Sequence, residues 1–292
     1  MTTERPEPGL RVLTAPNPSA MTLTGTRTYI LGEGQVALID PGPALRPHYE
    51  AILAALSPGE RITQILVSHA HLDHSPLARP LAEATGAPVL AFGPATAGRS
   101  AVMADLAARG LACGGEGVDP AFAPDRVLAD GEPVEGAFGT IRALHTPGHF
   151  CNHLSFAWQG ALFTGDHVMG WASTLISPPD GDLGDYFRSL DKVAAEGARV
   201  FYPGHGAPVR DTAARIAELR AHREQRSAQI LAALAAAPAT AARITQAIYT
   251  DTPAALLPAA ERNVFAHLIE LTSQNHIRPL QPLAITAPFE RL

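Results

Sequence analysis

Three histidines and an aspartate lie within six residues, at His69-Ala70-His71-Leu72-Asp73-His74. They directly follow the apolar segment Ile62–Ser68, which is typical of a buried β-strand. The residues after the cluster predict a helix, with Ser75 as its N-cap, Pro76 at its first position and Gly86 at its end. The fold must therefore place this polar cluster on a short loop between a strand and a helix.

Side chains alternate in an extended chain, so His69, His71 and Asp73 are expected to face one side of the loop. His74 falls outside this period, at the point where the chain turns toward the helix. The loop can thus offer side chains to two neighbouring positions. Neutral imidazole and carboxylate are ligands that zinc and similar divalent metals prefer. A solvated loop is the alternative interpretation, but the elements predicted on both sides favour a metal site.

Three further polar residues follow predicted strands, and each comes directly after a glycine: His149, Asp166 and His205. Glycine permits tight turns and close backbone approach, and loops at strand ends commonly carry functional residues. Taken alone, each is more often a turn residue. With the first cluster they make five histidines and two aspartates, about what two metal ions sharing a carboxylate and a water require.

The segments SHAHLDHS, HTPGH, FTGDH and YPGHG, spread over residues ~20–212, resemble the motifs of the metallo-β-lactamase superfamily. The resemblance implies an α+β fold, an αββα sandwich with a metal site at one edge of the sheets. It implies one zinc ion bound by His69, His71 and His149, a second bound by Asp73, His74 and His205, and Asp166 as the bridge. An aspartate like Asp166 is typical of glyoxalase II-like and tRNase Z-like hydrolases, so antibiotic hydrolysis is a minor alternative.

Other segments, HLDHSPLARPLAEATGAPVLAFGP and AHREQRSAQIL among them, are similar to the beta-lactamase-like protein 2 group, whose members carry a C-terminal winged-helix domain. Residues 1–212 then form the catalytic domain and residues 213–292 a small helical, winged-helix-like domain. We expect its helices over 212–236, 240–248 and 258–273, and a wing over 276–283. Phe150 replaces a threonine often found in this group, and we expect that change to affect a hydrogen bond beside the site.

The remaining segments favour two packed sheets with helices outside, because predicted strands alternate with helices and hairpins. Residues 1–20 contain four prolines and are expected to form an irregular edge segment. The stretch 170–185 follows Asp166 directly, and long irregular loops are often functional. We expect it to wall a substrate cleft together with part of the C-terminal domain.

Charge and cysteine content limit the possible partners. Residues 213–292 carry eight arginines and six acidic residues, a net charge of +2. Since the whole chain has a net charge of −6, the remaining residues have a net charge of −8, and this part of the chain is a poor general ligand for nucleic acid.

Two cysteines, Cys113 and Cys151, indicate a reducing compartment without a disulfide framework. Cys151 could be a soft metal ligand, but a small core residue is favoured. With no apolar run of about 18 residues and no signal peptide, a cytoplasmic protein without membrane contact is expected.

The favoured hypothesis is a metal-dependent hydrolase in which hydroxide activated by two Zn²⁺ ions attacks an ester or thioester of a small acyl substrate. Iron or manganese would fit the same ligands. Asp73 is the candidate catalytic residue, because it is the nearest group to orient the water or receive its proton. His153 is a candidate hydrogen-bond partner for the ligands. His145 and His167 are expected to point away from the metals.

Two other functions stay open. One is a zinc-dependent endoribonuclease acting on single-stranded RNA, which a winged-helix domain supports weakly. The other is a non-enzymatic, metal-stabilised binding protein, which predicts metals closed off from water. Tyr202 and Arg223 could touch a substrate, although a core aromatic and a solvated helix charge are equally good interpretations. Oligomeric state is also open, with a homodimer as one option.

Overall fold

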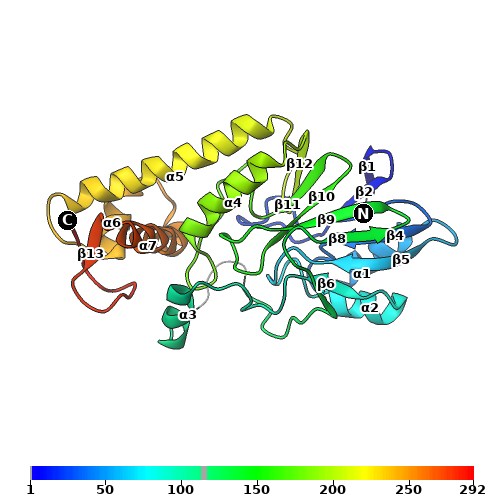
Figure 1. The fold of residues 1–292 in the computed structure, drawn as a ribbon, viewed down its shortest axis with the longest axis horizontal. Helices are drawn as coiled ribbons and strands as arrows, with labels where there is room; N and C mark the ends of the chain where they lie inside the picture. Colours follow the sequence, from blue (N-terminus) through cyan, green and yellow to red (C-terminus); the bar gives the residue numbers. More distant parts are fainter. Residues whose placement is uncertain (1, 113–116) are drawn as a thin grey trace.

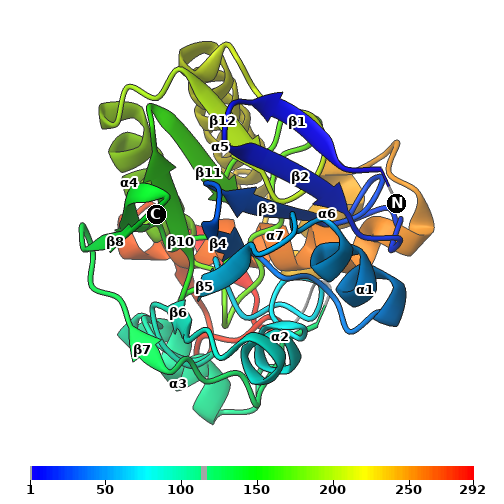
Figure 2. The same ribbon diagram turned by 90° about the vertical axis from the view of Figure 1, so that its right-hand side faces the viewer.

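A computed structural model describes residues 2–112 and 117–292. Two β-sheets face each other at one end of the molecule, and a mainly helical unit built by the last third of the chain lies at the other end (Figure 1). The view along the long axis shows the strands of both sheets with helices around them (Figure 2). Cys113 lies outside the described residues.

The first sheet has seven strands in sequence order. They are β1 (Glu4–Glu7), β2 (Leu10–Thr14), β3 (Arg27–Leu31), β4 (Gln35–Ile39), β5 (Arg61–Leu66), β6 (Val89–Ala91) and β7 (Arg126–Val127). The first four strands run antiparallel, and β4 to β7 run parallel. Helices α1 (Arg46–Ala54) and α2 (Ala78–Thr85) connect the parallel strands β4, β5 and β6.

The second sheet has five strands in the order β12-β11-β10-β9-β8. Their bounds are β8 (Pro133–Gly136), β9 (Gly139–His145), β10 (Leu154–Trp158), β11 (Ala161–Gly165) and β12 (Val200–Pro203). Strand β10 is antiparallel to both β9 and β11, and β12 is parallel to β11. The C-terminal ends of β9, β11 and β12 therefore meet at one edge of this sheet.

Apolar side chains fill three layers of this sandwich. Leu10, Val12 and Tyr29 of the first sheet pack against Phe156 and Phe163 of the second. A second cluster joins the first sheet to α1 and α2, and a third joins the second sheet to α4 (Leu183–Ala195). Strands with apolar residues on both faces need cover on both sides. The αββα sandwich inferred from the sequence is thus confirmed.

The C-terminal unit contains α5 (Thr212–Leu234), α6 (Ala241–Ile248), the 3₁₀ turn η1 (Ala254–Leu256), α7 (Leu257–Ser273) and the strand pair β13 (Ile277–Pro279) and β14 (Phe289–Arg291). Its core joins α5, α6, α7 and β14. Met103 and Leu106 of α3 (Ala101–Ala108) belong to the same core, although α3 precedes the sandwich's second sheet in sequence. No helix in the described ranges has the length and apolarity needed to cross a membrane.

Three local predictions were wrong. Residues 1–20 contain strands β1 and β2, because an edge strand tolerates Pro6 and because burial of Leu10 and Val12 stabilises β2. The predicted wing over 276–283 includes β13 but omits its partner β14, whose Phe289 is buried in the C-terminal core. Three-residue strands carry too little alternation to be found from sequence.

The third error concerns the start of α2. Leu77 is its N-cap residue, and the Ser75 hydroxyl instead donates to the carbonyl oxygen of His71 at 3.2 Å and to Asp119 Oδ2 at 3.0 Å. Ser75 therefore fastens the end of the ligand loop rather than the helix. Gly86 ends α2 in the left-handed conformation, with φ of 76°, as the sequence predicted.

Candidate metal centre

The seven candidate ligands meet at one edge of the sandwich because each follows the C-terminal end of a strand. The cluster from His69 to His74 follows β5, and His149, Asp166 and His205 follow β9, β11 and β12. A backbone hydrogen bond from Leu154 to Ser68, 2.7 Å long, joins the two sheets beside the site. Four segments that are distant in sequence thus share one small region.

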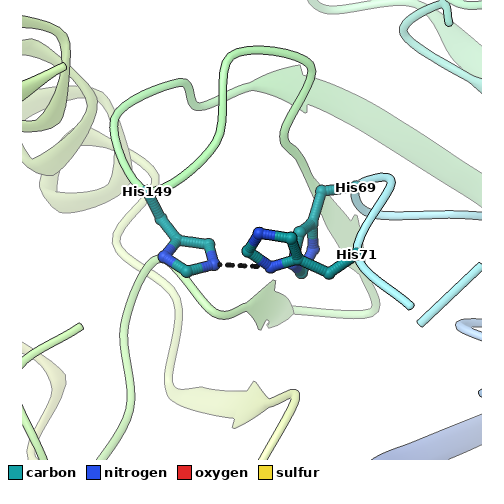
Figure 3. A group of neighbouring side chains, drawn as sticks. All are labelled: His69, His71 and His149. Carbon is teal, nitrogen blue, oxygen red and sulfur yellow. Dashed lines mark hydrogen bonds between the residues drawn. The ribbon is translucent and has the colours of Figure 1, made fainter. Parts of the chain in front are cut away.

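Three imidazoles form the first group: His69, His71 and His149 (Figure 3). His71 Nδ1 lies 2.9 Å from His69 Nε2 and 3.2 Å from His149 Nε2. Two ligand atoms of a tetrahedral zinc ion, each ~2.0–2.1 Å from the metal, lie about 3.3 Å apart. The three nitrogens therefore have spacings close to those of a zinc coordination sphere.

The second group consists of Asp73, His74 and His205. Asp73 Oδ2 lies 3.3 Å from His74 Nε2 and 3.1 Å from His205 Nε2. The turn after β5 explains why His74 joins this group. His69 and His71 face the first position, and His74 comes after the chain has begun to turn, as its place in the sequence suggested. The alternation that predicted Asp73 on the side of His69 and His71 was wrong, because the turn already includes residues 72–74 and Asp73 lies in the second group.

Asp166 lies between the two groups. Its Oδ1 is 3.5 Å from His74 Nε2, and its Oδ2 is 3.2 Å from His205 Nε2 and 3.8 Å from His149 Nε2. Gly204 makes this approach possible, because a Cβ there would lie 2.4 Å from Asp166 Oδ1. One carboxylate therefore reaches ligands of both groups, as a bridging position requires.

The residues fit a pair of divalent cations. Asp73 Oδ1, His74 Nε2, Asp166 Oδ1 and His205 Nε2 are buried atoms without a hydrogen-bond partner. Buried polar atoms normally have partners, and leaving them unmatched costs free energy. His74 Nε2 lies 3.5 Å from Asp166 Oδ1, and imidazole with carboxylate is a donor set for zinc, iron or manganese.

Burial and charge prepare the ligands differently in the two groups. Burial lowers the pKa of His71 to about 3 and holds the pKa of His69 and His149 below its usual value, so these rings are neutral and keep a lone pair. Burial alone would raise the pKa of Asp166, but His205 and His74 hold it well below its usual range. Burial alone would lower the pKa of His74 and His205, but the carboxylates of Asp73 and Asp166 raise it, to about 10 for His205 and well above its usual value for His74. Neutral imidazole and ionised carboxylate are the forms that bind metal, so a cation in the second group would displace a proton from each of these two rings.

Asp40 is a functional residue that the sequence analysis did not identify. Its Oδ2 accepts from His74 Nδ1 at 2.9 Å and from Ser68 Oγ at 2.7 Å, and Ser68 Oγ in turn lies 2.9 Å from His69 Nδ1. These bonds place the protons on Nδ1 and direct both Nε2 atoms to the centre. A signal was available, since Asp40 also follows a strand and precedes a Pro-Gly turn.

His205 and Asp73 form hydrogen bonds that sequence patterns do not reveal. His205 Nδ1 lies 3.3 Å from the carbonyl oxygen of Gly25, and Thr26 Oγ1 donates to Asp73 Oδ2 at 3.0 Å. Both partners belong to the segment before β3. The segment before β3 therefore supports a site whose ligands all follow other strands.

The structure places the remaining candidates around the centre. His153 Nε2 accepts from the backbone N–H of Asp166 at 3.3 Å, so it lies behind the bridging position. His145 stacks on Phe92 at a centroid distance of 3.6 Å, and the ring of His167 lies against Tyr186; neither belongs to the ligand groups. Both point away from the centre, as expected.

Four other residues make contacts with the protein core or with neighbouring segments. Cys151 lies in the cluster that covers the first sheet, outside the ligand groups, which agrees with a small core residue. The Tyr202 hydroxyl donates to Glu7 Oε1 at 2.6 Å, and Arg223 is buried against the 170–178 segment. The Phe150 ring packs on His71, with centroids 4.7 Å apart, so an apolar contact occupies the position where the related group often has a hydroxyl.

Comparison with known families agrees with this geometry. The model for the metallo-beta-lactamase superfamily matches residues 21–205. The chain belongs to this superfamily. A second model, for the beta-lactamase associated winged helix domain, matches residues 240–280 within the C-terminal unit. The resemblance inferred from the motifs is thus confirmed, and the chain is a hydrolase of this superfamily with a cluster suited to divalent metal.

Individual relatives match most of this chain. A beta-lactamase-like protein 2 homolog of Drosophila melanogaster is 33% identical and covers 90% of this chain and 87% of its own length. An atrochrysone carboxyl ACP thioesterase of Aspergillus fumigatus is also 33% identical, over 82% of this chain and 72% of its own. A metallo-beta-lactamase family protein of Thermus thermophilus has a TM-score of 0.79 at 28% identity and covers 98% of this chain and 99% of its own.

Proposed function

We propose that this protein is a dinuclear zinc hydrolase that cleaves the ester or thioester bond of a substrate with an apolar acyl group. The observation that carries the proposal is an apolar pocket of about 320 Å³ next to the metal centre. Its described lining residues carry no charge: Ala20, Met21, Met169, Trp171, Ala172, Ser173, Leu175, Tyr249, Thr252, Leu256, Ala259, Ala260 and Asn263. Such volumes and linings are typical of small-molecule sites.

The pocket adjoins the candidate ligands through two residues. The carbonyl oxygen of Leu175, a lining residue, lies 2.7 Å from His149 Nδ1. Trp171, another lining residue, packs against Gly206, where a Cβ would lie 2.7 Å from Trp171 Cδ1. Gly206 follows His205 directly. If the acyl chain of a substrate occupied this pocket, the scissile carbonyl attached to that chain would lie near the metal centre.

The role proposed for each part is specific. His69, His71 and His149 would hold one cation, Asp73, His74 and His205 the second, and Asp166 both. Divalent cations bound there would act as Lewis acids and make hydroxide available from water at neutral pH. Asp73 has its Oδ2 bonded to Thr26, while its Oδ1 has no partner. That oxygen is the proposed acceptor for the proton of the attacking water. The proton then passes to the leaving thiolate or alkoxide.

Ligand exposure supports an enzyme rather than a closed structural metal site. His149 retains 8% of its surface and Asp166 6%, whereas His69 and His74 are fully enclosed. His71 and Asp73 retain 5% each, so four of the seven ligands keep some contact with solvent. Structural zinc sites, by contrast, have all positions filled by protein ligands.

The endoribonuclease alternative has one specific observation in its favour, the winged-helix match at residues 240–280. Two arginines of the C-terminal unit, Arg262 and Arg226, however, make contacts within the protein. Arg262 of α7 donates to Ser177 Oγ at 2.5 Å and to the carbonyl oxygen of Pro178 at 2.6 Å, and Arg226 lies over the Tyr249 ring. Phosphate binding relies on basic side chains that face the ligand, so the acyl substrate is favoured.

A turnover panel tests the proposal. Zinc-loaded protein is assayed on decanoyl and acetyl thioesters of N-acetylcysteamine, on bis(p-nitrophenyl) phosphate and on single-stranded RNA. We expect hydrolysis of the thioesters, with a preference for the decanoyl chain, which the apolar pocket would bind. Cleavage of RNA alone would overturn the acyl proposal in favour of the nuclease, and no turnover of any substrate by zinc-bound protein would overturn both.

A further inference from the structure

The orientation of His149 depends on a segment outside the ligand loops. His149 Nδ1 lies 2.7 Å from the carbonyl oxygen of Leu175 and 3.0 Å from Thr174 Oγ1. A carbonyl oxygen can only accept, so Nδ1 carries the proton and Nε2 keeps its lone pair toward the centre. Residues 174 and 175 therefore select the tautomer that a metal ligand needs.

The C-terminal helices hold this segment on both sides of Leu175. Arg223 of α5 donates through Nη2 to the carbonyl oxygen of Thr174 and through Nη1 to Asn263 Oδ1, at 3.2 Å. Asn263 Oδ1, on α7, also accepts the backbone N–H of Ile176 at 3.1 Å. One arginine and one asparagine thus fix the backbone before and after the carbonyl that contacts His149.

The surroundings of Arg223 agree with such a role. Its side chain is buried, with 2% of its surface exposed, and burial lowers its pKa. Among the described residues, no carboxylate forms an ion pair with it. A buried guanidinium without a counter-charge costs free energy unless strong hydrogen bonds hold it. Its hydrogen bonds to Thr174 and Asn263, together with the Tyr186 ring of α4 at 5.6 Å from the guanidinium carbon, are the contacts available for this.

Arg220, three residues earlier on the same helix, is a natural contrast. It forms an ion pair with Asp191 of α4 and lies over the Phe187 ring at 5.4 Å. Its hydrogen bonds go to α4 and not to the 174–176 segment, so its guanidinium holds two helices together. The two arginines share a helix and a charge but differ in what they touch.

We propose that Arg223 and Asn263 are positioning residues that set the orientation of His149, so that the C-terminal unit determines metal affinity at the position formed by His69, His71 and His149. The inference rests on the proposed metal site. It goes beyond that site because it assigns the alignment of His149 to two residues that do not bind the metal, one of which, Asn263, also lines the apolar pocket.

Cobalt titration of the metal-stripped full-length protein tests the inference. We expect Arg223→Met to weaken one of the two Co²⁺ equivalents by ~10–100-fold, the range typical of lost ligand-supporting bonds. The ¹⁵N shifts of the His149 ring should change from one tautomer to a mixture. Arg223→Lys, which retains a donor for Thr174, should recover part of the affinity, and Arg220→Met should bind as the unaltered protein does.

Asn263→Leu provides a second test from the other helix, and it decides the matter if Arg223→Met does not fold. We expect the same weakening of one equivalent, with the other unchanged. Folded Asn263→Leu protein with unaltered Co²⁺ affinity and an unaltered His149 tautomer would overturn the inference while leaving the proposed hydrolase intact. If the unaltered protein bound no Co²⁺, the metal site itself would be wrong, and the proposed function would fail with it.

Discussion

All seven candidate ligands belong to the sandwich, whereas α5 and α7 supply hydrogen bonds. Helix α7 and the segment before it also form one wall of the apolar pocket. The sandwich ligands are held by side chains such as Asp40 and Ser68, which follow neighbouring strands. His149 is held instead by a loop carbonyl that the C-terminal helices fix. The residues that supply the metal-binding atoms and the residues that orient them can therefore come from separate parts of one chain.

The two regions are also less separate than a boundary at residue 212 suggests. Helix α5 packs Ile216 and Leu219 against the cluster that covers the second sheet, and Ile230 and Leu234 against the C-terminal core. Helix α3 packs Met103 into that same core. A division at residue 212 remains a prediction, and these shared cores indicate strong coupling across it.

The largest expected effect concerns Asp166, the carboxylate between the two ligand groups. Asp166→Asn removes the negative charge between the two positions, and we expect thioester hydrolysis to fall by at least ~10³-fold in kcat/KM, since several kcal/mol of charge stabilisation are lost. Bound zinc, measured by mass spectrometry, should also decrease. Asp105→Asn, on the exposed side of α3, is the matched control. A loss of less than tenfold would show that the sandwich does not supply the essential bridge.

The packing of α3 gives the next largest effect. Met103 has 1% of its surface exposed, and Met103→Ala is expected to lower the free energy of unfolding by about 2–5 kcal/mol, because the substitution leaves a cavity in the C-terminal core. Urea unfolding measures the change. Ala104→Ser, at an exposed position of the same helix, should change stability by no more than about 0.5 kcal/mol. If both variants had the same free energy of unfolding, the packing of α3 into that core would not contribute to stability.

The shared pocket gives a smaller, substrate-dependent effect. Trp171→Ala removes apolar surface next to the centre, and we expect kcat/KM for a decanoyl thioester to fall by ~10–100-fold, as burial of a large side chain contributes about 1.5–3 kcal/mol. The acetyl thioester should be hydrolysed at nearly the original rate. Leu280→Ala, at an exposed apolar residue outside the pocket, is the control. Equal losses for both substrates would mean that the pocket does not bind the acyl chain.

The last expected effect concerns a buried histidine of the sandwich that lies outside the ligand groups, and the quantity measured is the pH dependence of the free energy of unfolding. Burial lowers the pKa of His48, on α1, from 6.5 to about 4. The unfolded chain binds this proton more readily, so the stability from neutral His48 is complete above pH 6.5 and is lost as pH falls toward 4. The slope can reach ~1.4 kcal/mol per pH unit.

Replacing the ring tests that slope. His48→Asn should flatten the dependence of the unfolding free energy on pH between 6.5 and 4, measured with urea. His276→Gln, at an exposed position after α7, serves as the surface control. If His48→Asn has the same pH dependence as the unaltered protein, protonation of this histidine is not coupled to unfolding.

Much of the candidate site could be predicted because its ligands carry local signals. His69 to His74 follow a strongly apolar strand, and His149 and His205 each follow a Pro-Gly turn. The remaining contacts of the site carry no such signal in the sequence, or only a weak one. The Leu175 carbonyl is a backbone group available at every position, and Asp40 differs from other strand-end acids only in what lies beside it.

The sequence by itself determined which residues are suited to hold metal, because donor type, glycine placement and strand ends are properties of short segments. It also indicated the layered α+β fold through alternating strands and helices. Only the tertiary structure decided which nitrogen of each histidine faces inward, that Arg223 holds a loop instead of a substrate, and that α3 shares the C-terminal core. These outcomes depend on contacts between residues as far as 26 to 180 positions apart, and no local pattern encodes which partner a buried polar group will meet.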